Sequence, residues 1–141
     1  MKKGVAGLIS FCLVLALGAC GSVEQYELDG TWNYTTEVTE SNIEGFDVGD
    51  TGAGTYTITA TETAVTLTDE GEPDDEGTIV TERSGNKISY SDTVEVGPDS
   101  IRSDFEGTFT SPTAFSGTIS VAQTIDGNTT SATLALTMTK Q

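Results

Sequence analysis

Hydrophobic and polar residues alternate with a period of two from Tyr26 onward. Such alternation places successive side chains on opposite faces of a β-strand, whereas an amphipathic helix repeats every 3.6 residues or so. Threonine fills most of the polar positions, as is typical of exposed strand surface. The alternating runs lie at 26–38, 56–60, 65–67, 78–83, 88–96, 101–109, 115–125 and 132–138. The pattern therefore predicts an all-β domain of eight strands.

Turn-forming residues separate these runs. Asp126-Gly127 and Gly85-Asn86 are hairpin signals, and Gly97-Pro98-Asp99 and Ser111-Pro112-Thr113 mark two further turns. Short connections require antiparallel neighbours, and pairing the first strand with the last removes the exposed edges of a meander. We therefore predict an eight-stranded antiparallel up-and-down meander closed into a barrel. A two-sheet β-sandwich is the alternative, since alternation alone does not separate the two.

The N-terminus carries a targeting signal. Lys2 and Lys3 precede an apolar stretch, 4–17, that is shorter than the roughly 20 residues needed to span a bilayer. The stretch ends in Leu17-Gly18-Ala19-Cys20, which resembles the bacterial lipobox. The alternative is an ordinary secretory signal that happens to contain a cysteine.

The lipobox resemblance implies a division of the chain and a location. Residues 1–19 would be a cleaved signal peptide, 20–25 a lipidated tether, and 26–141 a single all-β domain. Cys20 would carry a diacylglyceryl thioether, usually with a further acyl chain on its amine, which makes a durable membrane anchor. Gly21 in place of aspartate implies the outer membrane if the organism is Gram-negative. We expect a lipid-anchored protein of the cell envelope.

Charge limits the partners. The domain that follows the signal has four basic residues against all 22 acidic ones, a formal charge of −18. Such a field disfavours nucleic acid and anionic membrane surfaces and favours cations or basic proteins. The alternative reading is solubility in a salty habitat.

Catalysis finds little support in the sequence. There is no histidine, Cys12 would leave with the signal, and Cys20 would be consumed by lipid. No Gly-X-Ser-X-Gly motif is present, and most carboxylates fall in turns or on outward positions, where a raised pKa is not expected. We expect a protein that is not an enzyme.

Gly30-Thr31-Trp32, on the first strand of an eight-strand meander, resembles the Gly-X-Trp signature of lipocalin-like barrels. The resemblance implies that Trp32 plugs the closed end, packed by a late basic residue, here Lys140. It also implies that the long first connection, 39–53, is a lid over the open end. The alternative is a loop that folds Ile43, Phe46 and Val48 onto the barrel rim.

A candidate ligand site follows from the inward positions. Asp92 shares a face with Tyr90, so it is either a polar anchor inside a cavity or turned outward by a bulge at 91–93. The candidate site residues are Trp32, Tyr34, Ile43, Phe46, Tyr56, Tyr90 and Asp92. Our hypothesis is a membrane-anchored, lipocalin-like lipoprotein that binds a small apolar ligand. The alternative is an acidic envelope interaction or inhibitor protein that captures a basic protein on its outer surface.

An acidic run offers oxygen ligands to a cation. It comprises Asp69, Glu70, Glu72, Asp74, Asp75 and Glu76. The spacing does not fit an EF-hand loop, because Gly71 and Pro73 occupy two ligand positions. The run is therefore a weak Ca²⁺ candidate or simply a solvated loop, and we expect no other cofactor.

Overall fold

A computed structural model of the chain describes residues 24–71 and 77–141. The predictions for the signal peptide, for Cys20 and for Glu72, Asp74, Asp75 and Glu76 lie outside this range. In the described part, no helix is both long enough and apolar enough to cross a membrane.

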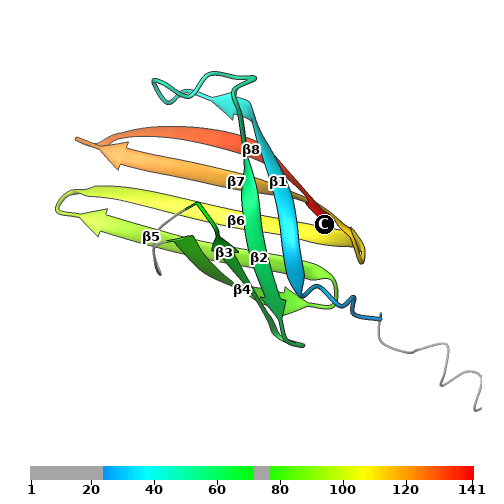
Figure 1. The fold of residues 1–141 in the computed structure, drawn as a ribbon. Coiled ribbons are helices and arrows are strands. Elements are labelled where there is room, and N and C mark those ends of the chain that lie inside the picture. Colours follow the sequence, from blue (N-terminus) through cyan, green and yellow to red (C-terminus); the bar gives the residue numbers. More distant parts are fainter. Residues whose placement is uncertain (1–23, 72–76) are drawn as a thin grey trace, which may run out of the picture.

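The described residues form a closed antiparallel β-barrel in which each strand pairs with the next along the chain and β1 pairs with β8 (Figure 1). The strands are β1 (Gly30–Ser41), β2 (Thr51–Ala60), β3 (Ala64–Asp69), β4 (Thr78–Ser84), β5 (Lys87–Val96), β6 (Asp99–Ser111), β7 (Ala114–Ile125) and β8 (Asn128–Lys140). The predicted meander and its closure are confirmed, and the β1–β8 pairing excludes the sandwich.

Two-residue turns set the register of three hairpins. Gly85 and Gly97 have φ of 63°, which suits the first central position of a type II′ turn. Asp126 and Gly127 have φ of 51° and 80°, as a type I′ turn requires. These turns twist in the same sense as the strands they join, so the predicted hairpins form where the sequence placed them.

The barrel closes fully at one end only. Glu82, Arg83 and Ser84 are the only β4 residues that pair with β5, whereas β5 and β6 pair along their whole length from Lys87 to Val96. Strands β5–β8 therefore continue past the end of the β4–β5 ladder, and their hairpin tips project to the left in Figure 1. We call this part of the barrel the open half, and the opposite end the closed end.

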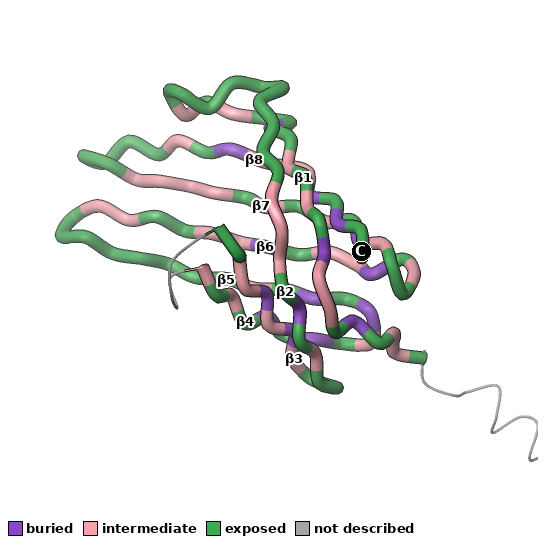
Figure 2. The backbone as a smooth tube through the Cα atoms, in the orientation of Figure 1, coloured by how far each residue is buried: buried purple, intermediate pink, exposed green. Residues whose placement is uncertain are grey.

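The closed end holds the core around Trp32 (Figure 2). Trp32 is fully buried, its indole N–H donates to the Leu28 carbonyl at 2.8 Å, and its ring meets Phe109 edge-on at 5.4 Å. Phe115 packs on Phe109 at 4.9 Å. The tryptophan occupies the position that the Gly-X-Trp resemblance implies, and buried aromatic rings surround it at this end of the barrel.

The segment before β1 differs from the prediction. Residues 26–29 alternate like a strand in the sequence, yet they are not part of the sheet. The Tyr26 N–H donates to the Asn86 side-chain carbonyl at 2.9 Å, and Asn86 in turn donates to the Glu24 carbonyl. Gly30, with φ of 140°, then turns the chain into β1. Residues 24–29 therefore bind the β4–β5 turn, with Leu28 inserted into the core.

The first connection is shorter than predicted. It spans 42–50 instead of 39–53, because both flanking strands extend further along their neighbours. Val38 and Asp50 close the loop through a backbone hydrogen bond of 2.9 Å. The Asn42 N–H donates to the Ser131 carbonyl of β8, and the Ser131 N–H donates to the Asn42 side-chain oxygen. Phe46 and Val48 remain exposed, so neither folds onto the rim.

Arg83 provides the buried basic group of the closed end. Its guanidinium donates to the carbonyls of Gly85 (2.9 Å), Thr61 (3.0 Å) and Tyr26 (2.8 Å), which ties β4 to the segment before β1. Burial lowers the pKa of Arg83, and the Asp29 carboxylate opposes that shift. Lys140, the residue implied by the resemblance, is the cross-strand partner of Trp32, and its Cε lies near Gly30.

We predict that Arg83→Met destabilises the protein by about 3 kcal/mol, because three carbonyls lose their donor. Urea unfolding followed by Trp32 fluorescence measures this. The matched control is Arg102→Met, at an exposed arginine whose single ion pair joins it to Asp104. It should change the free energy of unfolding by less than about 1 kcal/mol. Equal losses in the two variants would contradict the role assigned to Arg83.

Candidate functional site

The inner wall of the open half is apolar and accessible. Across this wall Tyr90, Phe105, Ile119 and Leu134 lie side by side in register. Nearer the hairpin tips, the cross-strand pair Val94 and Ile101 is 53% and 45% exposed. Inward apolar residues of a fully closed barrel would be buried, so this wall offers surface that the described chain does not cover. It is the candidate binding surface.

Two tyrosines and a carboxylate line the neighbouring wall. Tyr34 of β1 stacks on Tyr56 of β2 with ring centroids 4.4 Å apart, and its hydroxyl donates to Asp69 of β3 at 3.0 Å. The ring of Tyr34 lies over Gly54, where a Cβ would come within 2.6 Å of it. Burial, and then the Asp69 charge, raise the pKa of Tyr56. The cluster presents fixed aromatic surface, and the raised pKa keeps the Tyr56 phenol neutral at physiological pH.

Asp92 corrects one expectation. The β5–β6 register runs unbroken from Lys87 to Val96, so there is no bulge at 91–93 and Asp92 lies on the inner face. It is nevertheless exposed, because β4 does not pair with this part of β5. The Asp92 carboxylate accepts the Thr93 N–H at 2.8 Å, and burial and this carboxylate together raise the pKa of Tyr90.

The predicted ligand residues divide into two groups. Trp32 is fully buried at the closed end and has no surface for a ligand. In the open half, Tyr90 is half-buried and Asp92 is exposed, and on the neighbouring wall Tyr34 and Tyr56 are half-buried. In the 42–50 loop, Ile43 is half-buried and Phe46 is 48% exposed. Sequence reasoning missed Asp69 as the partner of Tyr34, since only the strand register brings them together.

Of the acidic run, only Asp69 and Glu70 lie in the described part of the chain. Asp69 faces the barrel interior, whereas the Glu70 carboxylate accepts the Thr57 hydroxyl on the outside at 2.7 Å. Strand geometry thus directs these two neighbours to opposite faces. Among the residues that the structure describes, no group of three or more potential ligands is placed to hold a metal ion.

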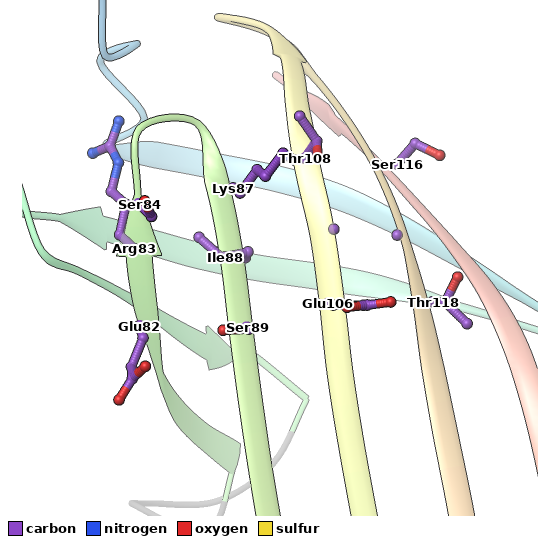
Figure 3. Close-up of a pocket in the computed structure, with 12 residues that line it drawn as sticks. Glu82, Arg83, Ser84, Lys87, Ile88, Ser89, Glu106, Thr108, Ser116 and Thr118 are labelled. Atoms are coloured by element: carbon purple, nitrogen blue, oxygen red, sulfur yellow. The ribbon is translucent and has the colours of Figure 1, made fainter. Parts of the chain in front are cut away.

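The outer face of β4–β7 carries two adjoining hollows of about 660 and 440 Å³. Both are lined by Glu82, Ser89, Glu106 and Thr118, which lie in one row across the four strands (Figure 3). We call these two hollows the outer groove. Glycines and the small side chains of serine and threonine leave the groove open. The sequence alone did not reveal it, because only the strand register brings these residues together.

Comparison with known proteins places the fold but no family. No family model matches the chain, and no curated protein matches it. One similar solved structure is the monomer form of the Mycobacterium tuberculosis PknI sensor domain, at a TM-score of 0.52 and 11% identity over 81% of this chain and 87% of that one. Another is EF1p2_mFAP2b bound to DFHBI, at a TM-score of 0.42 and 19% identity over 81% and 94%. At these identities the likeness concerns the fold alone.

The raised pKa of Tyr56 predicts a loss of stability at high pH. Ionisation of this phenol is harder in the folded state than in the unfolded chain, whose tyrosine pKa is 10.0. Stability is therefore fully present below pH 10 and declines above it, by at most roughly 1.4 kcal/mol per pH unit for this group. In urea unfolding at a series of pH values, Tyr56→Phe should decline less steeply than wild type. Equal slopes would contradict the assignment.

Proposed function

We propose that this protein is a lipid-anchored, non-enzymatic module of the cell envelope that binds a small apolar ligand on the inner wall of its open half. The observation that supports this most directly is the exposed apolar wall of β5–β8 beside the Tyr34–Tyr56 stack. Contiguous exposed apolar surface of this kind marks ligand-binding or interaction sites in proteins.

The chemistry of the wall defines the ligand class. Tyrosine rings favour a flat or aliphatic body, and the carboxylate of Asp92 favours a hydrogen-bond donor or a positive charge on it. The basic residues of the described chain lie elsewhere: Arg83 at the closed end, Arg102 against Asp104 and Lys140 opposite Trp32. Lys87 lines the outer groove. An apolar ligand with a donor group fits this wall better than an anionic one.

The anchor and the site would lie at opposite ends. Residues 24–29 reach the barrel at the closed end, bound to Asn86 and Arg83, while the hairpin tips of the open half project the other way (Figure 1). A lipid on Cys20, which only three residues separate from the bound Glu24, would hold the closed end near the membrane. The open half would then face away from the lipid surface.

We predict that the anchor depends on Cys20. Radiolabelled palmitate should enter the wild-type protein, and Cys20→Ser should abolish the label and block normal processing. The control is Cys12→Ser, which removes the other cysteine, within the apolar stretch, and should retain the label. Label that persists in Cys20→Ser, or a wild-type protein that partitions into the aqueous phase of a detergent separation, would contradict the anchor.

We predict that Nile red, a neutral apolar dye, binds the inner wall with enhanced fluorescence. Tyr90→Ser should weaken binding about fivefold, because it removes an aromatic contact. The control is Val80→Ser on the outer face of β4, where the valine is 58% exposed. A larger effect from Val80→Ser would place the dye on the outer face, and no dye binding would remove the ligand from the proposal.

A further inference from the structure

Strand β5 has a free edge. Its ladder with β4 ends at the pair Glu82 and Ser89, although β5 continues to Val96. No described strand other than β6 pairs with residues 90–96. An edge of this kind presents a row of unpaired backbone donors and acceptors.

The turns at the two ends of β5 show which groups are free. Ser84 and Lys87 flank one two-residue turn, and Val96 and Asp99 flank the other. The residues flanking such a turn form a hydrogen-bonded pair, and bonding alternates along the strand. The even-numbered residues therefore bond to β6. Ser91, Thr93 and Glu95 direct their backbone groups to the open edge.

A hydrogen bond of Thr93 independently supports this alternation of bonded and free residues. The backbone N–H of Thr93 donates to the Asp92 side chain at 2.8 Å instead of to a neighbouring strand. Residues 90–96 contain no proline, lysine or register shift, which are common means of blocking an edge. Among the described residues, the Asp92 carboxylate is the only side chain seen to accept a backbone N–H at this edge of β5. An incoming carbonyl would replace it.

An acidic groove adjoins this edge. The 440 Å³ hollow extends from Val80 and Glu82 of β4 past Ser91 to Glu106 of β6. Asp104 also lines it, but Arg102 neutralises Asp104 and holds the pKa of that carboxyl below its ordinary value. The other carboxylates of the hollow, Glu82 and Glu106, make no ion pair within the described chain. The groove therefore attracts positive charge.

We propose that the free edge of β5, at residues 90–96, binds an extended basic segment of a partner protein as an added strand. Its backbone would pair with Ser91, Thr93 and Glu95. Alternate side chains would then lie on the outer face, beside Glu95 and towards the hollow that Glu82 and Glu106 line, and on the inner face, beside Val94. The partner segment is thus one in which basic and apolar residues alternate. This site does not depend on the small ligand of the inner wall.

The test uses a capped peptide of alternating lysine and valine, about seven residues long, with its fluorescence anisotropy measured against the full domain. Binding should weaken at least fivefold when NaCl rises from about 0.01 M to about 1 M. A peptide N-methylated on its edge-pairing residues has the same charge but lacks those donors. It should bind about tenfold more weakly. Equal affinity of the two peptides would show that charge alone acts, which overturns strand addition.

Two pairs of variants sharpen the test. Thr93→Pro removes an edge N–H without touching the β6 ladder, so the fold should persist and peptide binding should fall about tenfold. Thr93→Ala keeps the N–H and should bind within about twofold of wild type. Glu106→Gln should weaken binding more than Glu37→Gln, an equal charge change on the outer face of β1. The Trp32 fluorescence and the far-ultraviolet circular dichroism of each variant report its fold.

Three outcomes would overturn the proposal. Thr93→Pro that stays folded and binds as wild type would show that the edge is not used. A domain that dimerises without peptide, and becomes monomeric with Thr93→Pro, would show that a second copy occupies the edge. Equal losses in Glu106→Gln and Glu37→Gln would show that the groove does not select the basic partner.

Discussion

A β-sheet can close on itself only where every strand has a neighbour on each side, and in this barrel β4 pairs with β5 over only three residues. β4 has seven residues, of which only Glu82, Arg83 and Ser84 pair with β5, whereas residues 78–81 pair with β3 alone. Where β4 and β5 pair, the sheet is continuous. Trp32 and Phe109 fill the closed end, and Arg83 links β4 to the segment before β1. Beyond the last pair of the β4–β5 ladder, Glu82 and Ser89, the inner wall of β5–β8 and one edge of β5 have no covering strand in the described chain. The candidate ligand surface and the docking edge both follow from the shortness of the β4–β5 ladder.

The sequence predicted the eight strands and their order because both depend on local chemistry. Alternation fixes which side chains share a face, and Gly85, Gly97 and Asp126-Gly127 fix where the chain reverses. How far two strands pair is not local. The alternation of β5 continues to Val96 whether or not β4 accompanies it, so the open half could not be seen in the pattern. Tyr26 and Leu28 misled for a related reason, since their strand-like spacing serves contacts with Asn86 and the core.

The candidate site was predictable to the same extent. The period of two placed Tyr34, Tyr56 and Tyr90 on the inner face, and the register agrees. It also placed Asp92 there, but the expected cost of burying a carboxylate argued for a bulge. That cost does not arise, because the facing wall is missing and Asp92 is exposed. The direction of a side chain can be derived from its strand, whereas its burial depends on a strand elsewhere in the chain.

Asp92 connects the two proposed sites physically. Its carboxylate interacts with the phenol of Tyr90 on the inner wall and accepts the N–H of Thr93 at the edge. A strand added at the edge would supply a carbonyl to Thr93 and free one oxygen of Asp92 for a donor on the inner wall. A ligand that engages Asp92 would in turn weaken its hold on Thr93 and expose the edge donor. Any such coupling must be reciprocal, because it is a single free energy shared by two binding equilibria. The two proposed sites can each function alone, and the Asp92 carboxylate is a group that both would contact.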